Sequence, residues 1–343
     1  MMLQNRHPFA RVAAAAARAA TRRSFSSSSN PIGFVGLGKM GAGMARNLAL
    51  CGHEVVLFDV DAAVTSLVAE SIPGARAAAS PADVAAQTST VVSMVPNDAC
   101  LNSVVKASDG LLSAGSQQLL HISCSTVSPF TSRELSELGG GGYTHVSAPV
   151  FARPDGIEAN QAYFPISGGT DADRVRATEL LSSTSPKAFN FGDDPGAANV
   201  VKLCGNYMIA ASIQSLAESL ALAENNGLDR VEVMEMLTST IFDCLIYKGY
   251  GQRVAMRDHK PGGFALELGL KDVTLVLDTA HHSKVPMPLG SVLHDRWLAS
   301  FAKGRGAVDW SAVGLSVSED SGVDVAQELE AAMKAASDEL AKK

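Results

Sequence analysis

The chain has 343 residues, 46% of them hydrophobic and 18% charged, which is enough apolar material for the cores of two ordinary globular domains. Its formal net charge of -7 argues against a nucleic-acid-binding protein, because such a protein would show a basic surface. No apolar run reaches the roughly 20 residues of a membrane-spanning helix, so no membrane partner is expected.

The N-terminal segment differs in composition from the rest of the chain. Residues 1–30 contain five arginines and no acidic residue, with an alanine-rich run and then the serines Ser26–Ser29. Alanines with spaced arginines favour the amphipathic cationic helix of a mitochondrial targeting presequence. We therefore predict a presequence over residues 1–30 and a mature protein in the mitochondrial matrix. A chloroplast transit peptide and a disordered tail are the alternatives.

A short apolar run, Ile32–Val35, leads into a turn with the spacing G-x-G-x-x-G. Apolar residues at helical spacing follow, and a second apolar run ends on Asp59. This order of strand, turn, helix, strand and acid is typical of a dinucleotide-binding unit, in which the turn and the helix N-terminus hold the pyrophosphate. The alternative is a glycine-rich turn in another doubly wound fold. The predicted cofactor contacts in the turn are Gly36, Leu37, Gly38, Lys39, Met40 and Gly41.

Asp59 is also a predicted cofactor contact, and it bears on which cofactor binds. Its carboxylate would accept hydrogen bonds from the ribose hydroxyls of the adenosine and would repel a 2′-phosphate. The dozen residues after it contain no arginine that would offset this repulsion. The sequence therefore favours NAD, with NADP as the alternative.

Strands and helices continue to alternate as far as about Asp194. Ser80 and Pro81 are predicted to begin a helix. Two of the later predicted strands end in side chains that could contact a ligand. The further predicted strands are Thr90–Val95, Gln117–Ile122, Tyr143–Val150 and Tyr163–Ser167. We predict an α/β fold with a Rossmann-type doubly wound sheet domain over residues 31–194, whose ligands bind beyond the carboxyl ends of the strands.

Two of these predicted strand ends carry candidate contacts. Val95 and Pro96 would form a rigid apolar wall for a nicotinamide. Ser125 and Thr126 would offer hydroxyl donors to an amide or a carboxylate. The alternative for each pair is that these residues only end a strand and begin a loop.

The second half is predicted to be an all-helical domain over residues 195–320. Asp194 is the predicted N-cap and Pro195 the first residue of a long helix. In that helix Lys202 and Asn206 lie four residues apart and therefore on one face. An ammonium in a mostly apolar helix needs a partner unless it snorkels to solvent, which is the alternative.

The last third of the chain adds a lysine and a tail. Lys271 and Asp272 interrupt another helical apolar pattern, where an exposed charge pair is the alternative. An exposed helical tail is predicted over residues 321–343. The eight histidines show no metal-ligand spacing and the chain has no G-x-S-x-G elbow, so neither a metal site nor a nucleophilic triad is expected.

Taken in order, these motifs resemble those of the β-hydroxyacid dehydrogenase family. The matching segments are GFVGLGKMG, SMVPND, SCSTVSP, APV, KLCGN, GLKD and GRGAVDWSAV, and they span nearly all of residues 31–315. The resemblance implies a Rossmann-type domain followed by an all-helical domain, with the active site in the cleft between them. It also implies a homo-oligomer, either a dimer or a tetramer.

The resemblance assigns the chemistry to the long helix. It implies that Lys202 is the catalytic acid and base and that Asn206 holds the substrate one turn away. Ser125, with its hydroxyl donor at a strand end, is the further predicted substrate contact. Hydride loss from a carbinol needs a base for the hydroxyl proton, and burial beside a positive nicotinamide ring favours neutral lysine. The implied cofactor contacts beyond the glycine turn are Val95, Pro96, Thr126 and Lys271.

One segment departs from the family pattern A-P-V-S-G-G, because the chain reads A-P-V-F-A-R here. Phe151 replaces a hydroxyl donor with bulk, and Arg153 adds a cation that is predicted to contact the substrate carboxylate. A solvent-facing arginine is the alternative. The expected substrate is 3-hydroxyisobutyrate, but this departure from the family pattern allows a different one.

Three hypotheses follow for the function. The leading one is an NAD-dependent oxidoreductase of a small β-hydroxy acid or its semialdehyde. The first rival is an NADP-dependent glyoxylate or succinic semialdehyde reductase, a branch that often has Asn-Arg-Thr where this chain has Phe58-Asp59-Val60. The second is a non-catalytic cofactor-binding scaffold, against which the retained Lys202 and Asn206 argue. Imine reduction is disfavoured because that branch generally lacks the lysine.

Overall fold

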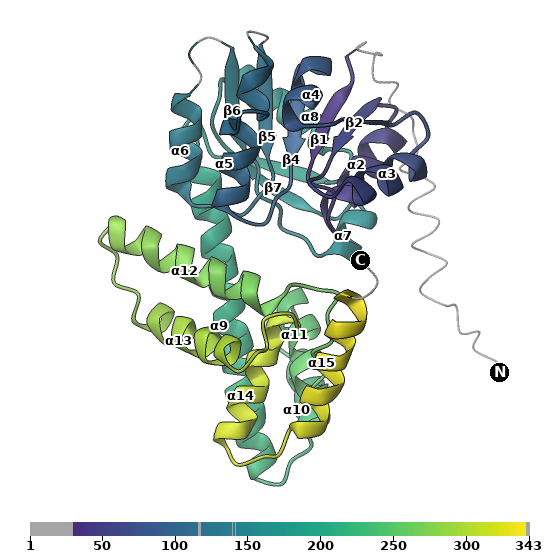
Figure 1. Cartoon of the computed structure of the whole chain (residues 1–343). Helices are drawn as coiled ribbons and strands as arrows, with labels where there is room; N and C mark the ends of the chain where they lie inside the picture. Colours follow the sequence, from purple (N-terminus) through teal and green to yellow (C-terminus); the bar gives the residue numbers. More distant parts are fainter. Residues whose placement is uncertain (1–29, 116–117, 139, 141, 341–343) are drawn as a thin grey trace, which may run out of the picture.

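The computed structural model describes residues 30–115, 118–138, 140 and 142–340. The predicted presequence lies outside the described residues except for its last residue, Asn30. Figure 1 shows a sheet domain and a helical domain, with the helix α9 (Ala197–Asn225) running from the first into the second. The predicted α/β fold with a following helical domain is confirmed.

Six parallel strands form the sheet of the first domain in the order β3-β2-β1-β4-β5-β6, which is the Rossmann order. Side chains alternate between the two faces, so Phe34 and Leu57 join the core on one side while Val35 and Val56 join that on the other. The strands are β1 (Ile32–Val35), β2 (Val55–Phe58), β3 (Arg76–Ala77), β4 (Thr90–Ser93), β5 (Leu119–Ser123) and β6 (Tyr143–Ser147). The predicted residue Gln117 lies outside the described residues.

Helices with clear start signals connect the strands. Ser80 accepts a hydrogen bond from the backbone N–H of Asp83 at 3.1 Å, and Pro81 is the first helical residue of α4, as predicted. Gly52, with φ +92°, follows the end of α2 in the left-handed region, where glycine is favoured. The helices are α2 (Gly41–Leu50), α3 (Ala62–Ser71), α4 (Pro81–Gln87), α5 (Asp98–Lys106), α6 (Pro129–Glu137), α7 (Pro154–Glu158) and α8 (Asp171–Leu181).

The predicted strand over residues 163–167 does not extend the main sheet. It forms β7 (Tyr163–Ile166), which pairs in parallel with β8 (Lys187–Asn190) in a separate two-stranded sheet. An isolated antiparallel bridge between Ser147 and Ser167 links it to the end of β6. The sequence did not predict β8, because its residues are mostly exposed and show no apolar run.

The long helix α9 starts later than predicted. Gly196 takes the cap position, whereas Asp194 accepts a hydrogen bond from the N–H of Gly196 at 3.0 Å and pairs with Arg133 at 2.8 Å. Hydrogen bonds bind the first turn of α9 to the sheet domain. The N–H of Ala198 donates to Ser167 Oγ at 2.9 Å, and the Asn199 amide donates to Ser132 Oγ at 2.7 Å.

Five further helices pack around α9 to form the helical domain. Its core includes the fully buried Trp297 and Trp310, whose rings meet edge to face. The helices are α10 (Arg230–Thr238), α11 (Leu245–Met256), α12 (Leu266–His282), α13 (Pro288–Ala302) and α14 (Val313–Asp320). Within the described ranges, no helix is both long and apolar enough to cross a membrane.

The predicted tail forms α15 (Ala326–Leu340), and its last three residues lie outside the described part of the chain. Contrary to the expected exposed helix, Val325, Ala332 and Ala336 are buried in the core of the helical domain, with Leu329 packed against them. These positions recur at helical spacing and therefore form one apolar strip. Figure 1 shows α15 beside α11, with its C-terminal end turned towards the sheet domain.

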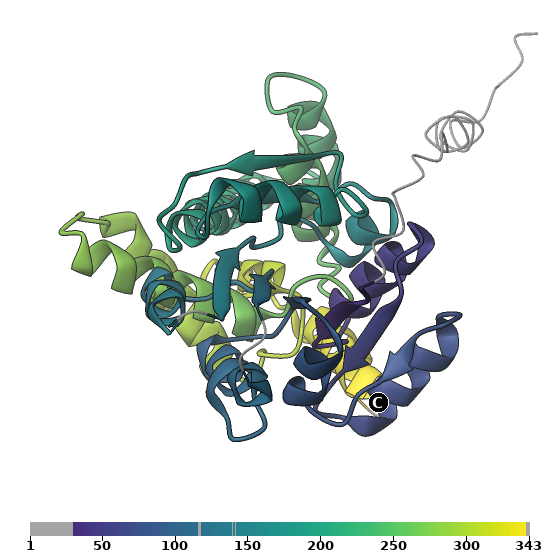
Figure 2. The same ribbon diagram turned by 90° about the horizontal axis from the view of Figure 1, so that it is seen from above.

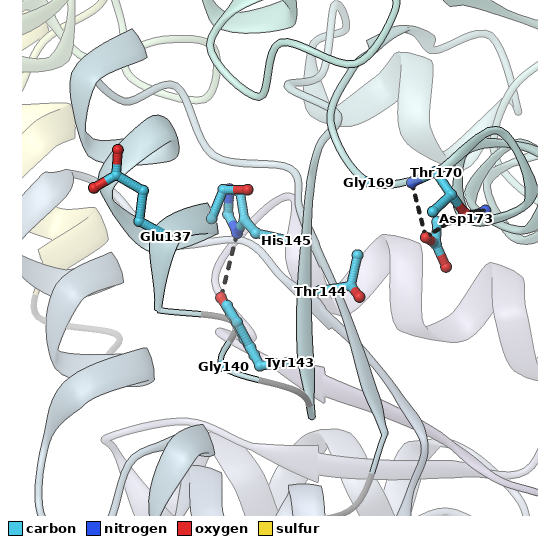
Figure 3. Close-up of a pocket in the computed structure, with 9 residues that line it drawn as sticks. Glu137, Gly140, Tyr143, Thr144, His145, Gly169, Thr170 and Asp173 are labelled. Carbon is cyan, nitrogen blue, oxygen red and sulfur yellow. Dashed lines mark hydrogen bonds between the residues drawn. The ribbon is translucent and has the colours of Figure 1, made fainter.

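A buried polar cluster crosses the sheet beneath a shallow hollow on the surface. His121 hydrogen-bonds Ser93 Oγ at 2.8 Å and the Tyr143 hydroxyl at 2.7 Å, and that hydroxyl lies 3.3 Å from His145 Nδ1. Figure 3 shows Tyr143 and His145 at the wall of the hollow, whose volume is about 440 Å³. Burial lowers the pKa of His145 to about 4 and that of His121 well below its usual range, so both rings are neutral in the folded protein.

These neutral histidines should make the fold sensitive to acid. Above about pH 6.5 the two histidine rings are uncharged in the folded and in the unfolded protein. Between about pH 6.5 and 4 the unfolded chain binds protons on these rings, whereas the folded chain excludes them. For His145 this lowers the free energy of unfolding by roughly 3 kcal/mol across that window. We expect the melting temperature to fall steeply from pH 6.5 to 4.5. A His145→Asn variant should show a shallower slope, and a flat wild-type profile would contradict the prediction.

Candidate active site

The three glycines of the turn have three different surroundings. Gly36 has φ +90°, and a Cβ there would lie 2.3 Å from the carbonyl oxygen of Met94. A Cβ at Gly41 would lie 1.9 Å from the carbonyl oxygen of Gly36. A Cβ at Gly38 would meet no heavy atom of the described residues within 4 Å. The turn is therefore tight at Gly36, closely packed at Gly41 and open at Gly38, where a phosphate needs room.

The helix behind the turn presents its N-terminus to this open space. It begins at Gly41, and the cap position is taken by Met40, whose thioether is a poor hydrogen-bond acceptor. The first N–H groups of such a helix attract anions. Beside the turn, Asp59 accepts hydrogen bonds from the N–H of Leu37 at 2.7 Å and from that of Asp61 at 3.0 Å. Turn, helix and acid together fit a dinucleotide with a pyrophosphate and a ribose.

The two predicted strand ends meet at the same edge of the sheet. The N–H of Val95 donates to Ser125 Oγ at 2.8 Å, and Pro96 follows directly. Val95 Cγ1 would lie 3.2 Å from a Cβ at Gly36, so this wall borders the glycine turn. The structure therefore brings Val95, Ser125 and the glycine turn together, with Thr126 next in the chain.

Lys202 is buried rather than snorkelling, since only 8% of it is exposed. Its Nζ donates to Asn206 Oδ1 at 2.9 Å and lies 4.1 Å from the centre of the Phe151 ring. Burial lowers the pKa of Lys202 to about 8; the negative charge of Asp272 opposes this shift and the positive charge of Lys271 adds to it. The amine is therefore poised to exchange a proton near neutral pH.

A polar chain continues from Asn206 to the sheet domain. The Asn206 amide donates to Asp272 Oδ2, Asp272 Oδ1 lies 2.9 Å from Lys271 Nζ, and Lys271 Nζ donates to the carbonyl oxygen of Thr126 at 2.5 Å. Asp272 is 1% exposed, so the alternative of a surface charge pair is wrong for it. The sequence did not assign Asp272 a role, although Gly269, Asp272, Val273 and Val276 recur at the spacing of a buried helix face.

Phe151 packs directly on the helix that carries the lysine. A Cβ at Gly205 would lie 2.4 Å from Phe151 Cε1, so the ring fits only because Gly205 has no side chain. The backbone of Phe151 exchanges hydrogen bonds with Tyr163 at 2.8 and 3.1 Å, which fixes the ring beside Lys202. The amine therefore faces an aromatic wall on this side.

Arg153 reaches from the sheet domain to the helical domain. Its Nη1 lies 3.9 Å from Oδ2 of the buried Asp309, and its guanidinium lies 5.5 Å from the centre of the Tyr250 ring. The side chain is 32% exposed, so it is neither fully solvated nor fully enclosed. Arg153 thus has protein partners in the helical domain and keeps part of its guanidinium accessible.

The described residues contain no group of three or more His, Cys, Asp or Glu side chains placed to hold a metal ion. The histidines that the structure buries are used in other ways. His121 and His145 belong to the cluster in the sheet, and His259 hydrogen-bonds Ser311 Oγ at 2.9 Å.

Two family descriptions match the two domains. The family described as the NAD binding domain of 6-phosphogluconate dehydrogenase matches residues 31–192. The family described as NAD-binding of NADP-dependent 3-hydroxyisobutyrate dehydrogenase matches residues 196–316.

Individual proteins are similar over most of the chain. The mitochondrial 3-hydroxyisobutyrate dehydrogenase of Rattus norvegicus is 31% identical over 293 residues, which cover 83% of this chain and 86% of the rat protein. The 3-sulfolactaldehyde reductase of Escherichia coli is 32% identical over 285 residues, which cover 82% and 94%. The solved structure of Mycobacterium tuberculosis 3-hydroxyisobutyrate dehydrogenase with L-serine has a TM-score of 0.74 at 29% identity and covers 84% and 99%.

Proposed function

The chain belongs to the β-hydroxyacid dehydrogenase family, and on that premise we propose that it is an NAD-dependent oxidoreductase of a small β-hydroxy acid or its semialdehyde. As a member it is an oxidoreductase with a binding domain for a nicotinamide dinucleotide. The observation that carries the proposal is the buried amine of Lys202, with a pKa of about 8, held by Asn206. A protein that only bound the cofactor would have no use for it.

The proposed mechanism divides the work between cofactor and lysine. The nicotinamide, when bound, accepts or returns the hydride. Lys202 in its neutral form takes the hydroxyl proton of the substrate during oxidation, and its ammonium form returns that proton during reduction. Asp272 accepts from the Asn206 amide and so turns Asn206 Oδ1 towards Lys202, which fixes the amine in place. Lys271, by donating to the Thr126 carbonyl, keeps the two domains together beside the reaction centre.

NAD is the proposed cofactor because of the place of Asp59. Its carboxylate lies beside the turn, hydrogen-bonded to the N–H of Leu37, where a 2′-phosphate would meet a like charge. Lys39, in the turn itself, is the cation that argues for NADP, but its amine already pairs with Glu339 of α15. The family description of the second domain mentions NADP, so both cofactors belong in the test.

The substrate acid group is proposed to lie near Ser125, Asn206 and Arg153. Ser125 Oγ accepts from the N–H of Val95, which leaves its own O–H free to donate. The accessible part of the Arg153 guanidinium offers a charge, whereas Phe151 offers only an apolar wall. We therefore propose 3-hydroxyisobutyrate as the default substrate and expect an acid with a modest apolar substituent to be accepted beside the ring.

A substrate panel with both cofactors tests the proposal. The purified protein is incubated with 3-hydroxyisobutyrate, other short β-hydroxy acids and sulfonate analogues, each with NAD and with NADP, and in the reverse direction with glyoxylate and succinic semialdehyde, each with NADH and with NADPH; the reduced cofactor is followed by absorbance. We expect activity with NAD on one or more carboxylic acids. Preference for NADP on an aldehyde acid would support the rival reductase, and tight cofactor binding without turnover on any substrate would support the scaffold.

Two further expectations remain proposals. We propose that the presequence directs the protein to mitochondria, as the composition of residues 1–30 suggests. Imaging residues 1–30 fused to a fluorescent protein tests this, and a cytosolic signal would contradict it.

We also propose a dimer or tetramer, supported by exposed apolar side chains of the helical domain such as Ile241 and Leu245, and testable by light scattering.

A further inference from the structure

The C-terminal helix α15 lies beyond both family matches, the second of which ends at residue 316. Leu329, Ala332 and Ala336 of α15, with Val325 just before the helix, form an apolar strip that packs in the helical domain. Figures 1 and 2 both show the C-terminal end of α15 close to the sheet domain. The helix is therefore packed against one domain and has its C-terminal end beside the other.

That end reaches the glycine turn. The Glu339 carboxylate forms an ion pair with Lys39 Nζ, and the two side chains are 34% and 44% exposed. Lys39 stands between Gly38, which faces open space, and the N-terminus of α2. An acidic group from the far end of the chain thus lies beside the predicted phosphate site.

We propose, building on the proposed function, that Glu339 competes with the cofactor's phosphates for Lys39 and thereby weakens cofactor binding. The cofactor's phosphates and the carboxylate are both anions, so the amine cannot pair fully with both. The pair is partly exposed, which limits the effect to roughly fivefold in the dissociation constant. Such changes appear mainly in the dissociation rate, so Glu339 promotes release of the cofactor after each turnover.

The test uses the full chain and two matched substitutions on α15. Glu339→Gln removes the charge, whereas Asp338→Asn removes the charge of the neighbouring exposed residue and serves as the control. Binding of ADP is measured by calorimetry, and NADH dissociation is measured by stopped-flow fluorescence. We expect about fivefold tighter ADP binding and slower NADH release for Glu339→Gln, and no change for Asp338→Asn.

Two further measurements distinguish competition for Lys39 from a structural effect of the substitution. In a Lys39→Met background, Glu339→Gln should change ADP affinity little, because the shared partner is gone. In 0.5 M NaCl the ratio between Glu339→Gln and wild type should approach one, because salt screens exposed charges. Unchanged or weaker ADP binding by Glu339→Gln would overturn the inference. A wild-type protein that binds neither ADP nor NADH would instead overturn the proposed cofactor site, and the inference with it.

Discussion

Replacing Lys202 by methionine is expected to lower turnover by roughly a hundredfold to ten-thousandfold while cofactor binding stays near normal. Methionine is unbranched like lysine, one atom shorter, and fills most of the buried space, but it has no proton to exchange. In the structure the amine contacts Asn206 and the Phe151 ring, not the glycine turn, so the cofactor site should persist. Steady-state rates and NADH titration by fluorescence measure the two effects separately.

The same experiment has a pH signature and a control. Because Lys202 has a pKa of about 8 and acts as base in its neutral form, the rate of oxidation should rise with pH through about 8 in the wild type. That rise should be absent from the residual activity of Lys202→Met. Lys248→Met, at an exposed lysine paired with Asp243, should leave both rate and profile unchanged. Near-normal turnover of Lys202→Met would remove this amine from the mechanism.

Alanine substitutions at two glycines of the turn should have opposite consequences. Gly38→Ala adds a methyl group where the structure has open space, so the melting temperature should stay the same while NADH affinity falls at least about tenfold, because the methyl occupies the approach of the pyrophosphate. Gly41→Ala places its methyl against the carbonyl of Gly36, so it should lower the free energy of unfolding by roughly 1 to 3 kcal/mol.

Thermal unfolding and NADH titration of both variants decide between the two roles. Each variant serves as the control for the other, since the chemical change is identical and the sites are three residues apart. Wild-type NADH affinity in Gly38→Ala would show that the cofactor does not approach the turn at this glycine. An unchanged melting temperature in Gly41→Ala would show that the helix can shift away from the turn without cost.

The parts of the site that the sequence predicted are the local ones. The glycine turn, Asp59, and the pair Lys202 and Asn206 are recognised from spacing within one helix or one strand-turn-helix unit. The residues of each group lie close together in the sequence, so their spacing alone is enough to identify them. The structure brings the strand-end residues Val95 and Ser125 together as expected, because parallel strands end at one edge of a sheet.

The parts that the sequence did not predict depend on contacts between distant segments. Asp272 meets Asn206 across 66 positions, and Glu339 meets Lys39 from the last helix. The local sequence pattern does not indicate which distant residue a charged side chain will contact. The strand β8 was missed for a different reason, because it has no apolar run. The predicted start of α9 at Pro195 was also early, because Asp194 is held by Arg133 and by Gly196.

The hydrogen bonds at the start of α9 have a consequence for domain motion. The N–H of Ala198 and the Asn199 side chain are hydrogen-bonded to Ser167 and Ser132, so we expect Lys202, less than one turn beyond Asn199, to move with the sheet domain although its helix runs into the helical domain. A hinge motion between the domains would then leave the distance between the Lys202 amine and the glycine turn nearly unchanged.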